Sequence, residues 1–176
     1  MAAFASWPKL PDEPTAKAAY YPNLEKNSLF PGYIAMRSSH SRGATVDLTL
    51  VPLNASADAP SPPRNTIAPC TAPRDQRAPD DSLDMGTSFD CFDAKAHTRI
   101  SGLTEEQRKN RGLLVDVMNR HGFRNYENEW WHFTLHQEPY PDTIFDFPIA
   151  PRNQGNNSQK LGRPRTANPT SGLSDG

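Results

Sequence analysis

A strict alternation of apolar and polar residues predicts a β-strand over residues 45–51. The apolar face consists of Val46, Leu48 and Leu50, and the polar face consists of Thr45, Asp47 and Thr49. A period of two residues is typical of a strand with one face buried. Asp47 is therefore expected on the polar side, shortly after Gly43, whose lack of a side chain permits a tight backbone approach.

A second alternation predicts a strand over residues 130–136. One face consists of Trp131, Phe133 and Leu135, and the other of Trp130, His132, Thr134 and His136. If the two strands are neighbours, His132 faces the same side of the sheet as Asp47. Glu129 precedes His132 by three residues, which in a straight strand would place it on the opposite face. We therefore expect a turn before the strand that brings Glu129 back toward His132.

Residues 103–122 carry the pattern of an amphipathic helix. Thr104 followed by Gln107 forms a capping box, and Gly122 is a suitable stop. The residues that recur at helical spacing are Leu114, Val117, Met118 and His121. We expect this helix to pack on the sheet and to carry no chemistry.

Composition divides the 176 residues into one domain with an insertion and a tail. A chain of this length forms one core, which we place in residues 1–150. Six of the 18 prolines lie between Pro60 and Pro79, so residues 54–83 are expected to be an extended or disordered surface insertion. Residues 151–176 are rich in Asn, Gly, Ser and Pro and are expected to be a disordered tail.

Charge and cysteine content restrict the function classes. A net charge of -1 gives no field for nucleic acid or anionic membranes, and no apolar run is long enough for a membrane span. The N-terminus lacks the pattern of a signal peptide, so we expect a cytoplasmic protein, or a periplasmic one if a longer N-terminus exists. Cys70 and Cys91 could form a disulfide, but two free thiols are the favoured expectation for a cytosolic chain.

Two imidazoles and one carboxylate form a candidate metal site. His40, Asp47 and His132 match the three protein ligands of a catalytic zinc, which leaves one position for water. Glu129 is a candidate base for that water. The alternative is structural: single histidines in a domain are more often hydrogen-bonded than metal-bound, and Asp47 could simply end a strand. His97, His121 and His136 are assigned structural roles, as are Trp130 and Trp131.

These clusters resemble the zinc D-alanyl-D-alanine dipeptidases of the VanX type, which are related to D-Ala-D-Ala carboxypeptidases and to the hedgehog signalling domain. The family pattern SxHxxGxAxD is similar to residues 38–47, with Thr45 where alanine is usual, and ExxH is similar to residues 129–132. Further similar blocks lie at residues 30–35, 84–90 and 130–149. The resemblance implies an α+β fold, with a small antiparallel sheet carrying the zinc site and helices packed on one side.

The resemblance also implies residue roles. His40, Asp47 and His132 would bind one Zn²⁺ per chain, and Glu129 would act as base and acid. Asp90 corresponds to the residue that holds the substrate ammonium, although a structural cap is the alternative for it. Tyr33 and Ser38 correspond to residues that line the substrate pocket. The expected partner is a small dipeptide; the oligomeric state stays open.

One family feature is missing from the sequence. Family members carry an upstream Asp-Ala-Tyr-Arg-Pro stretch whose arginine stabilises the oxyanion, and we expect this chain to be N-terminally truncated relative to them. Two hypotheses follow: a zinc dipeptidase for D-Ala-D-Ala in cell-wall precursor metabolism or vancomycin-type resistance, and a catalytically impaired zinc-binding relative. A third, a peptidase for longer wall peptides, fits less well because an acidic anchor for the free amine suits a dipeptide.

Overall fold

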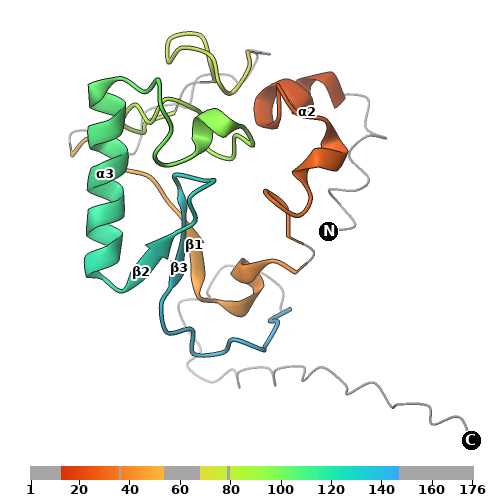
Figure 1. Ribbon diagram of the computed structural model, residues 1–176, viewed down its shortest axis with the longest axis vertical. Helices are drawn as coiled ribbons and strands as arrows, with labels where there is room; N and C mark the ends of the chain where they lie inside the picture. The colour runs from red at the N-terminus through yellow and green to blue at the C-terminus, as the bar shows by residue number, and fades with distance from the viewer. Residues whose placement is uncertain (1–12, 36, 54–67, 79, 147–176) are drawn as a thin grey trace, which may run out of the picture.

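The computed structural model describes residues 13–35, 37–53, 68–78 and 80–146. The elements, in chain order, are helix α2 (Glu13–Tyr20), the 3₁₀ helices η2 (Lys26–Leu29) and η3 (Ser39–Arg42), strand β1 (Thr45–Asp47), 3₁₀ helix η4 (Ala94–Ala96), helix α3 (Glu105–Arg120), and strands β2 (Phe123–Asn125) and β3 (His132–Leu135). Helix α3 lies along one side of the small sheet, and α2 lies on the opposite side of the molecule (Figure 1). The expected α+β class is confirmed.

The three strands form one antiparallel sheet in the order β1-β3-β2. Strands β1 and β3 are neighbours, which is the condition for Asp47 and His132 to meet, and Asp47 lies directly opposite His132. Both strands are shorter than the alternation indicated, because regular pairing covers only residues 45–47 and 132–135. The pairing nevertheless brings Asp47 and His132, which are far apart in sequence, next to each other. The position of the candidate site follows from this contact.

The predicted burial of strand β1 is wrong at its first two residues. Val46 is 42% exposed, whereas Thr45 is buried and its hydroxyl contacts the Thr134 hydroxyl at 3.0 Å. Helix α3 packs against β2, at the edge of the sheet far from β1, and so leaves Val46 uncovered. Leu48 and Leu50 pack against the core as expected.

Helix α3 begins with the predicted capping box. The Thr104 hydroxyl accepts from the Gln107 N–H at 3.2 Å, and the Gln107 side chain accepts from the Thr104 N–H at 3.1 Å. The helix ends before Gly122, which adopts a φ of +82° that glycine tolerates without strain. His121 is exposed rather than part of the buried stripe, because the helix has already ended there.

The core lies between α3 and the sheet. Its buried residues are Cys70, Met85, Cys91, Ala96, Leu114, Val115, Met118, Trp130, Trp131 and Phe133. Arg111 of α3 is also buried and donates to the carbonyls of Met85 at 2.7 Å, Lys95 at 3.0 Å and His97 at 2.6 Å. These hydrogen bonds attach the irregular segment 84–98 to the helix, since its own carbonyls would otherwise be buried without donors.

The cysteines differ from expectation. Cys70 and Cys91 form a disulfide, so the prediction of two free thiols is wrong. The sequence contains no signal that distinguishes the two states, because the residues are 21 positions apart and meet only through the tertiary fold.

The predicted insertion and tail are described only in part. Residues 54–67 of the insertion and the whole predicted tail, 151–176, lie outside the described residues. From residue 68 onward the insertion consists of turns in which Cys70, Arg77 and Ser82 are buried, so this part packs on the domain instead of extending from it. Within the described residues, no helix is both long and apolar enough to cross a membrane.

Candidate metal and catalytic site

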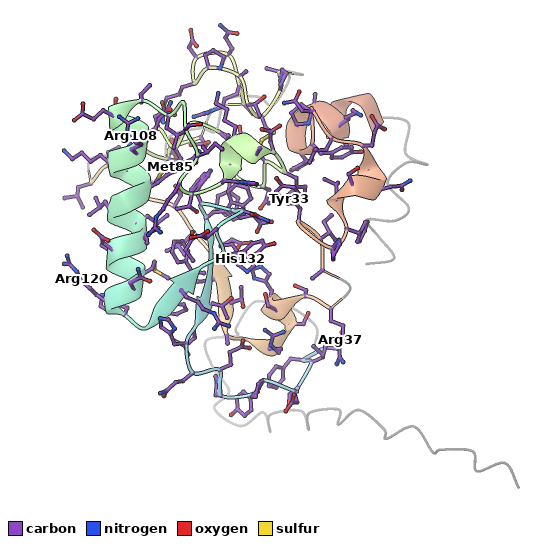
Figure 2. All side chains as sticks on the ribbon, in the orientation of Figure 1. Tyr33, Arg37, Met85, Arg108, Arg120 and His132 are labelled. Carbon is purple, nitrogen blue, oxygen red and sulfur yellow. A yellow bond between two sulfur atoms is a disulfide. The ribbon has the colours of Figure 1, made fainter. Side chains whose placement is uncertain are left out.

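All seven predicted site residues line one pocket of about 280 Å³. Its lining comprises Tyr33, Ile34, Ala35, Ser38, Ser39, His40, Asp47, Asp90, Phe92, Glu129, Trp131 and His132. In Figure 2, Tyr33 of the N-terminal segment and His132 of the sheet lie on either side of the same space, whereas Arg37 lies at the rim of the molecule. The pocket therefore joins segments that are almost 100 residues apart in the sequence.

The three predicted ligands converge. One ligand atom from each of His40, Asp47 and His132 lies within 4.8 Å of the others. The Asp47 carboxylate lies between the two rings, with Oδ2 at 3.3 Å from His40 Nε2 and Oδ1 at 3.1 Å from His132 Nδ1. The two imidazole rings meet edge to face, with centroids 4.9 Å apart. Two nitrogens and one carboxylate oxygen are donors that zinc accepts.

The second ring nitrogen of His40 has a backbone partner. His40 Nδ1 lies 3.2 Å from the Thr45 carbonyl oxygen, so this nitrogen carries the proton and donates. Nε2, which faces Asp47, is then left as the lone-pair nitrogen. A hydrogen bond from the other ring nitrogen is the usual way in which metal-bound histidines are oriented. Gly43, at φ +74°, ends η3 and turns the chain into β1.

A charged pair attaches η3 to the segment after the sheet. The Arg42 guanidinium binds the Glu138 carboxylate through two hydrogen bonds, of 2.5 Å from Nε and 3.0 Å from NH2. The pairing raises the pKa of Arg42 and lowers that of Glu138. The Phe145 N–H also donates to the Ser41 carbonyl at 2.7 Å. The loop that carries His40 is therefore held mainly by polar contacts near the surface.

The expected turn before β3 is present. The Glu129 N–H donates to the Tyr126 carbonyl at 2.9 Å, and the His132 N–H donates to the Glu129 carbonyl at 3.2 Å. This double turn brings Glu129 Oε2 to 3.3 Å from His132 Nδ1. Trp130 and Trp131, which lie between them in sequence, are both buried in the core as expected, and Trp131 also lines the pocket.

The Glu129 carboxyl is buried in an acidic environment. It is 5% exposed, and its Oε1 has no hydrogen-bond partner among the described residues. Burial, followed by the charges of Asp47 and Asp90, raises its pKa to about 8. A buried oxygen without a partner is costly, and three mutually repelling carboxylates favour a cation between them. Both observations fit a divalent metal ion at this site.

Asp90 lies on the other wall of the pocket. Burial and the Asp47 charge raise its pKa to about 6, and His132 acts in the opposite direction. Its backbone adopts a φ of +55°, a left-handed conformation that is uncommon outside glycine and is often found at functional positions. A capping role is seen instead at Asp93, whose carboxylate accepts from the Lys95 N–H at 2.8 Å.

Sequence reasoning missed one neighbour of the pocket, His97. Its Nε2 lies 2.9 Å from the Tyr33 hydroxyl, and burial raises the pKa of Tyr33 to about 12, with Asp93 and Glu129 acting in the same direction. Tyr33 therefore keeps its proton at neutral pH. His97 was assigned a purely structural role because it belongs to no motif. Only the fold, which brings residue 97 next to residue 33, identifies the pair.

No lysine or arginine lines the pocket in the part of the chain that the structure describes. Arg42 is paired with Glu138, and Arg37 is exposed. Neither of these two arginines, which are the nearest in sequence to His40, therefore contributes a positive charge to the pocket.

Comparison with known proteins shows similarity to one family of peptidases. A family model described as D-Ala-D-Ala dipeptidase matches residues 70–150. The chain is 35% identical over 148 residues to the D-alanyl-D-alanine dipeptidase of Enterococcus faecalis and 38% identical over 148 residues to that of Streptomyces coelicolor. Each match covers 84% of this chain and 61% of the relative, so the chain spans about three fifths of their length. Residues 70–150 therefore match the D-Ala-D-Ala dipeptidase family, and most of the chain is similar to proteins named D-alanyl-D-alanine dipeptidase.

Proposed function

We propose that this protein is a zinc-dependent dipeptidase that hydrolyses D-Ala-D-Ala. The relatives named above support the substrate class. The observation that carries the proposal is the convergence of three ligand atoms within 4.8 Å beside the buried Glu129 Oε1, which has no hydrogen-bond partner among the described residues. A structural interpretation of these histidines would not explain why a carboxylate is left without a donor at the same place.

His40, Asp47 and His132 would hold the ion. When bound, zinc would act as a Lewis acid toward the scissile carbonyl and lower the pKa of water. The chain supplies the remaining groups. The aromatic side chains of Phe92 and Trp131 line the same pocket and form an apolar part of its wall.

Glu129 would transfer the proton. Its carboxylate takes one proton from the attacking water, whose oxygen forms the new bond to the scissile carbonyl carbon. As the C–N bond breaks, the same carboxyl gives that proton to the leaving amine, so one water is consumed for each bond cleaved. Burial raises the pKa of the Glu129 carboxyl in the metal-free protein, and a bound cation would lower it toward the ionised form that accepts the proton.

Asp90 would bind the substrate's free ammonium group, and Ser38 and Tyr33 would line the substrate subsite. A buried carboxylate forms a charge-assisted hydrogen bond with an ammonium group, and this interaction would hold the free amino end at a fixed position in the pocket. Tyr33 keeps its proton, and its hydroxyl can donate to substrate when His97 Nε2, 2.9 Å away, is the donor to it. The pocket of about 280 Å³ suits a ligand of dipeptide size better than a long peptide.

The test is a hydrolysis assay with purified protein. With one equivalent of Zn²⁺, we expect release of D-alanine from D-Ala-D-Ala, and we expect N-acetyl-D-Ala-D-Ala to react much more slowly because it lacks the ammonium group. Stoichiometric zinc binding without hydrolysis would contradict the proposal and identify the catalytically impaired relative. Equal turnover of the acetylated substrate would point to a peptidase for longer wall peptides.

The biological setting is proposed only in general terms. Hydrolysis of D-Ala-D-Ala would link the protein to cell-wall precursor metabolism or to vancomycin-type resistance. The cytoplasmic location stays a prediction, as does the absence of nucleic-acid and membrane partners.

A further inference from the structure

Asn125, the last residue of β2, faces the turn that carries the proposed base and one proposed metal ligand. Its side-chain Nδ2 donates to the Glu129 carbonyl at 3.0 Å and to the His132 carbonyl at 3.0 Å. A single amide group therefore holds the backbone at both ends of the ExxH segment. The sequence motif gives no reason to expect this contact.

The orientation of this amide follows from its partners. Two carbonyl oxygens can only accept, so the NH₂ group must face them. The Asn125 Oδ1 then faces the Thr98 hydroxyl, which donates to it at 2.5 Å. Thr98 is itself buried, and its N–H donates to the Glu127 carbonyl at 2.8 Å. The amide is thus fixed from both sides.

Backbone hydrogen bonds also hold the turn, from the Glu129 N–H to the Tyr126 carbonyl at 2.9 Å and from the Tyr126 N–H to the His132 carbonyl at 2.9 Å, but neither joins residue 129 directly to residue 132. The hydrogen bond from the His132 N–H to the Glu129 carbonyl is long, at 3.2 Å. Without a brace, an extended chain would place residues 129 and 132 on opposite faces. The short separation of 3.3 Å between Glu129 Oε2 and His132 Nδ1 accompanies this bent conformation, to which Asn125 adds two side-chain hydrogen bonds.

We propose that Asn125 is a positioning residue. It would hold the Glu129 carboxylate and the His132 imidazole at positions from which the imidazole binds the ion and the carboxylate reaches the water beside it. The inference rests on the proposed function for its kinetic part. Loss of outer contacts of this kind typically costs about 10–100-fold in metal affinity or activity.

The matched control is Asn110. It is also an asparagine with low exposure, and its Nδ2 donates to one backbone carbonyl, that of Asp84, at 2.9 Å. It lies on α3 and does not line the pocket. Asn125→Ala and Asn110→Ala therefore each remove an amide that donates to the backbone, and only the first removes contacts with the turn, although Asn110 is the more buried of the two.

The experiment measures Zn²⁺ affinity by competition with a chromophoric chelator, kcat and KM for D-Ala-D-Ala, and Tm. We expect Asn125→Ala to lower zinc affinity and kcat by about 10–100-fold each, with KM changed less than about threefold. Asn110→Ala should lower Tm and leave zinc affinity and kcat near those of the parent. Thr98→Val keeps the Asn125 amide but removes the hydroxyl that donates to its Oδ1. It should lower zinc affinity and kcat by a smaller factor, and it replaces Asn125→Ala as the test variant if Asn125→Ala does not fold.

If Asn125→Ala behaves like Asn110→Ala in both zinc affinity and kcat, the positioning role is wrong. If the parent binds zinc but hydrolyses nothing, the proposed function fails, and the zinc affinity of Asn125→Ala alone then decides the positioning role.

Discussion

The two halves of the candidate site are built in different ways. The downstream half, Glu129 to His132, is anchored in the core: the side chains of Glu129 and His132 are 6% and 16% exposed, and the tryptophans between them are buried. The upstream half begins in η3, where the His40 side chain is 40% exposed and the neighbouring Arg42 is held by an ion pair. The pairing of Asp47 opposite His132 joins the two halves.

Because one half is buried and the other is exposed, we expect the two halves to contribute differently to metal binding and to proton transfer. A residue held by many buried contacts keeps its position without ligand, whereas a surface loop with few apolar contacts opens more easily. The downstream half therefore supplies the preorganised chemistry. The upstream half completes the ligand set, so its changes should affect metal affinity before they affect the proton transfer.

The largest effect is expected at the buried half. Glu129→Gln preserves the shape of the side chain but removes the group that takes the proton. We expect kcat for D-Ala-D-Ala to fall by about 10²–10⁴-fold, with one zinc still bound, as measured by steady-state kinetics and metal analysis of the same sample. Parent-like activity in Glu129→Gln would show that another group is the base.

The exposed half is tested through the ion pair that holds η3. Arg42→Gln should weaken zinc binding severalfold, because His40 is less well positioned, while kcat at saturating zinc changes little. The control is Arg99→Gln, which breaks the more exposed pair between Arg99 and Glu127, 3.7 Å apart, and which should change neither quantity. A fall in kcat at saturating zinc in Arg42→Gln would contradict the division of tasks.

The acidic interior of the site predicts how the metal-free protein responds to pH. Folding raises the pKa of Glu129 to about 8 and that of Asp90 to about 6, because burial disfavours their charged forms. The stability that these protonated groups contribute is fully present below the ordinary carboxyl pKa and is lost as the pH rises through these values. Tm of the metal-free protein should therefore fall between pH 5 and pH 8, and the fall should be smaller in Glu129→Gln. A Tm profile for Glu129→Gln that follows the parent would show that this carboxyl is not the source.

The smallest effect is expected at the edge of the sheet. Val46 is exposed on β1, so Val46→Thr should change the free energy of unfolding by no more than about 0.5 kcal/mol, as measured by urea denaturation. A loss of about 2 kcal/mol or more would mean that the valine is buried in solution, as its alternating pattern suggested.

Local patterns predicted the elements that local chemistry determines. The Thr104 capping box follows from residues near one another in sequence. Alternation likewise located the strands that carry Asp47 and His132, but their pairing was only a condition that the fold meets. The sequence motifs and the family resemblance identified seven site residues, and all seven line one pocket in the structure. The Glu129 turn was expected because a straight strand could not serve the proposed chemistry.

Features that depend on tertiary contacts were not predictable. Val46 has the alternation of a buried residue and is exposed, because the position of α3 decides which part of the sheet is covered. Three contacts join residues that are distant in sequence or belong to no motif. They are the Cys70–Cys91 disulfide, the Tyr33–His97 contact and the hydrogen bonds from Asn125 to the turn. Strand β2, three residues long, is too short to show a period.

The most direct measurement is a crystal structure of the zinc-loaded protein with an anomalous difference map at the zinc edge. The account predicts one ion, bound by His40 Nε2, His132 Nδ1 and the Asp47 carboxylate at about 2.0–2.2 Å, with Glu129 beside it and not among its ligands. An ion bound elsewhere, or a ligand set that omits any of these three residues, would contradict it.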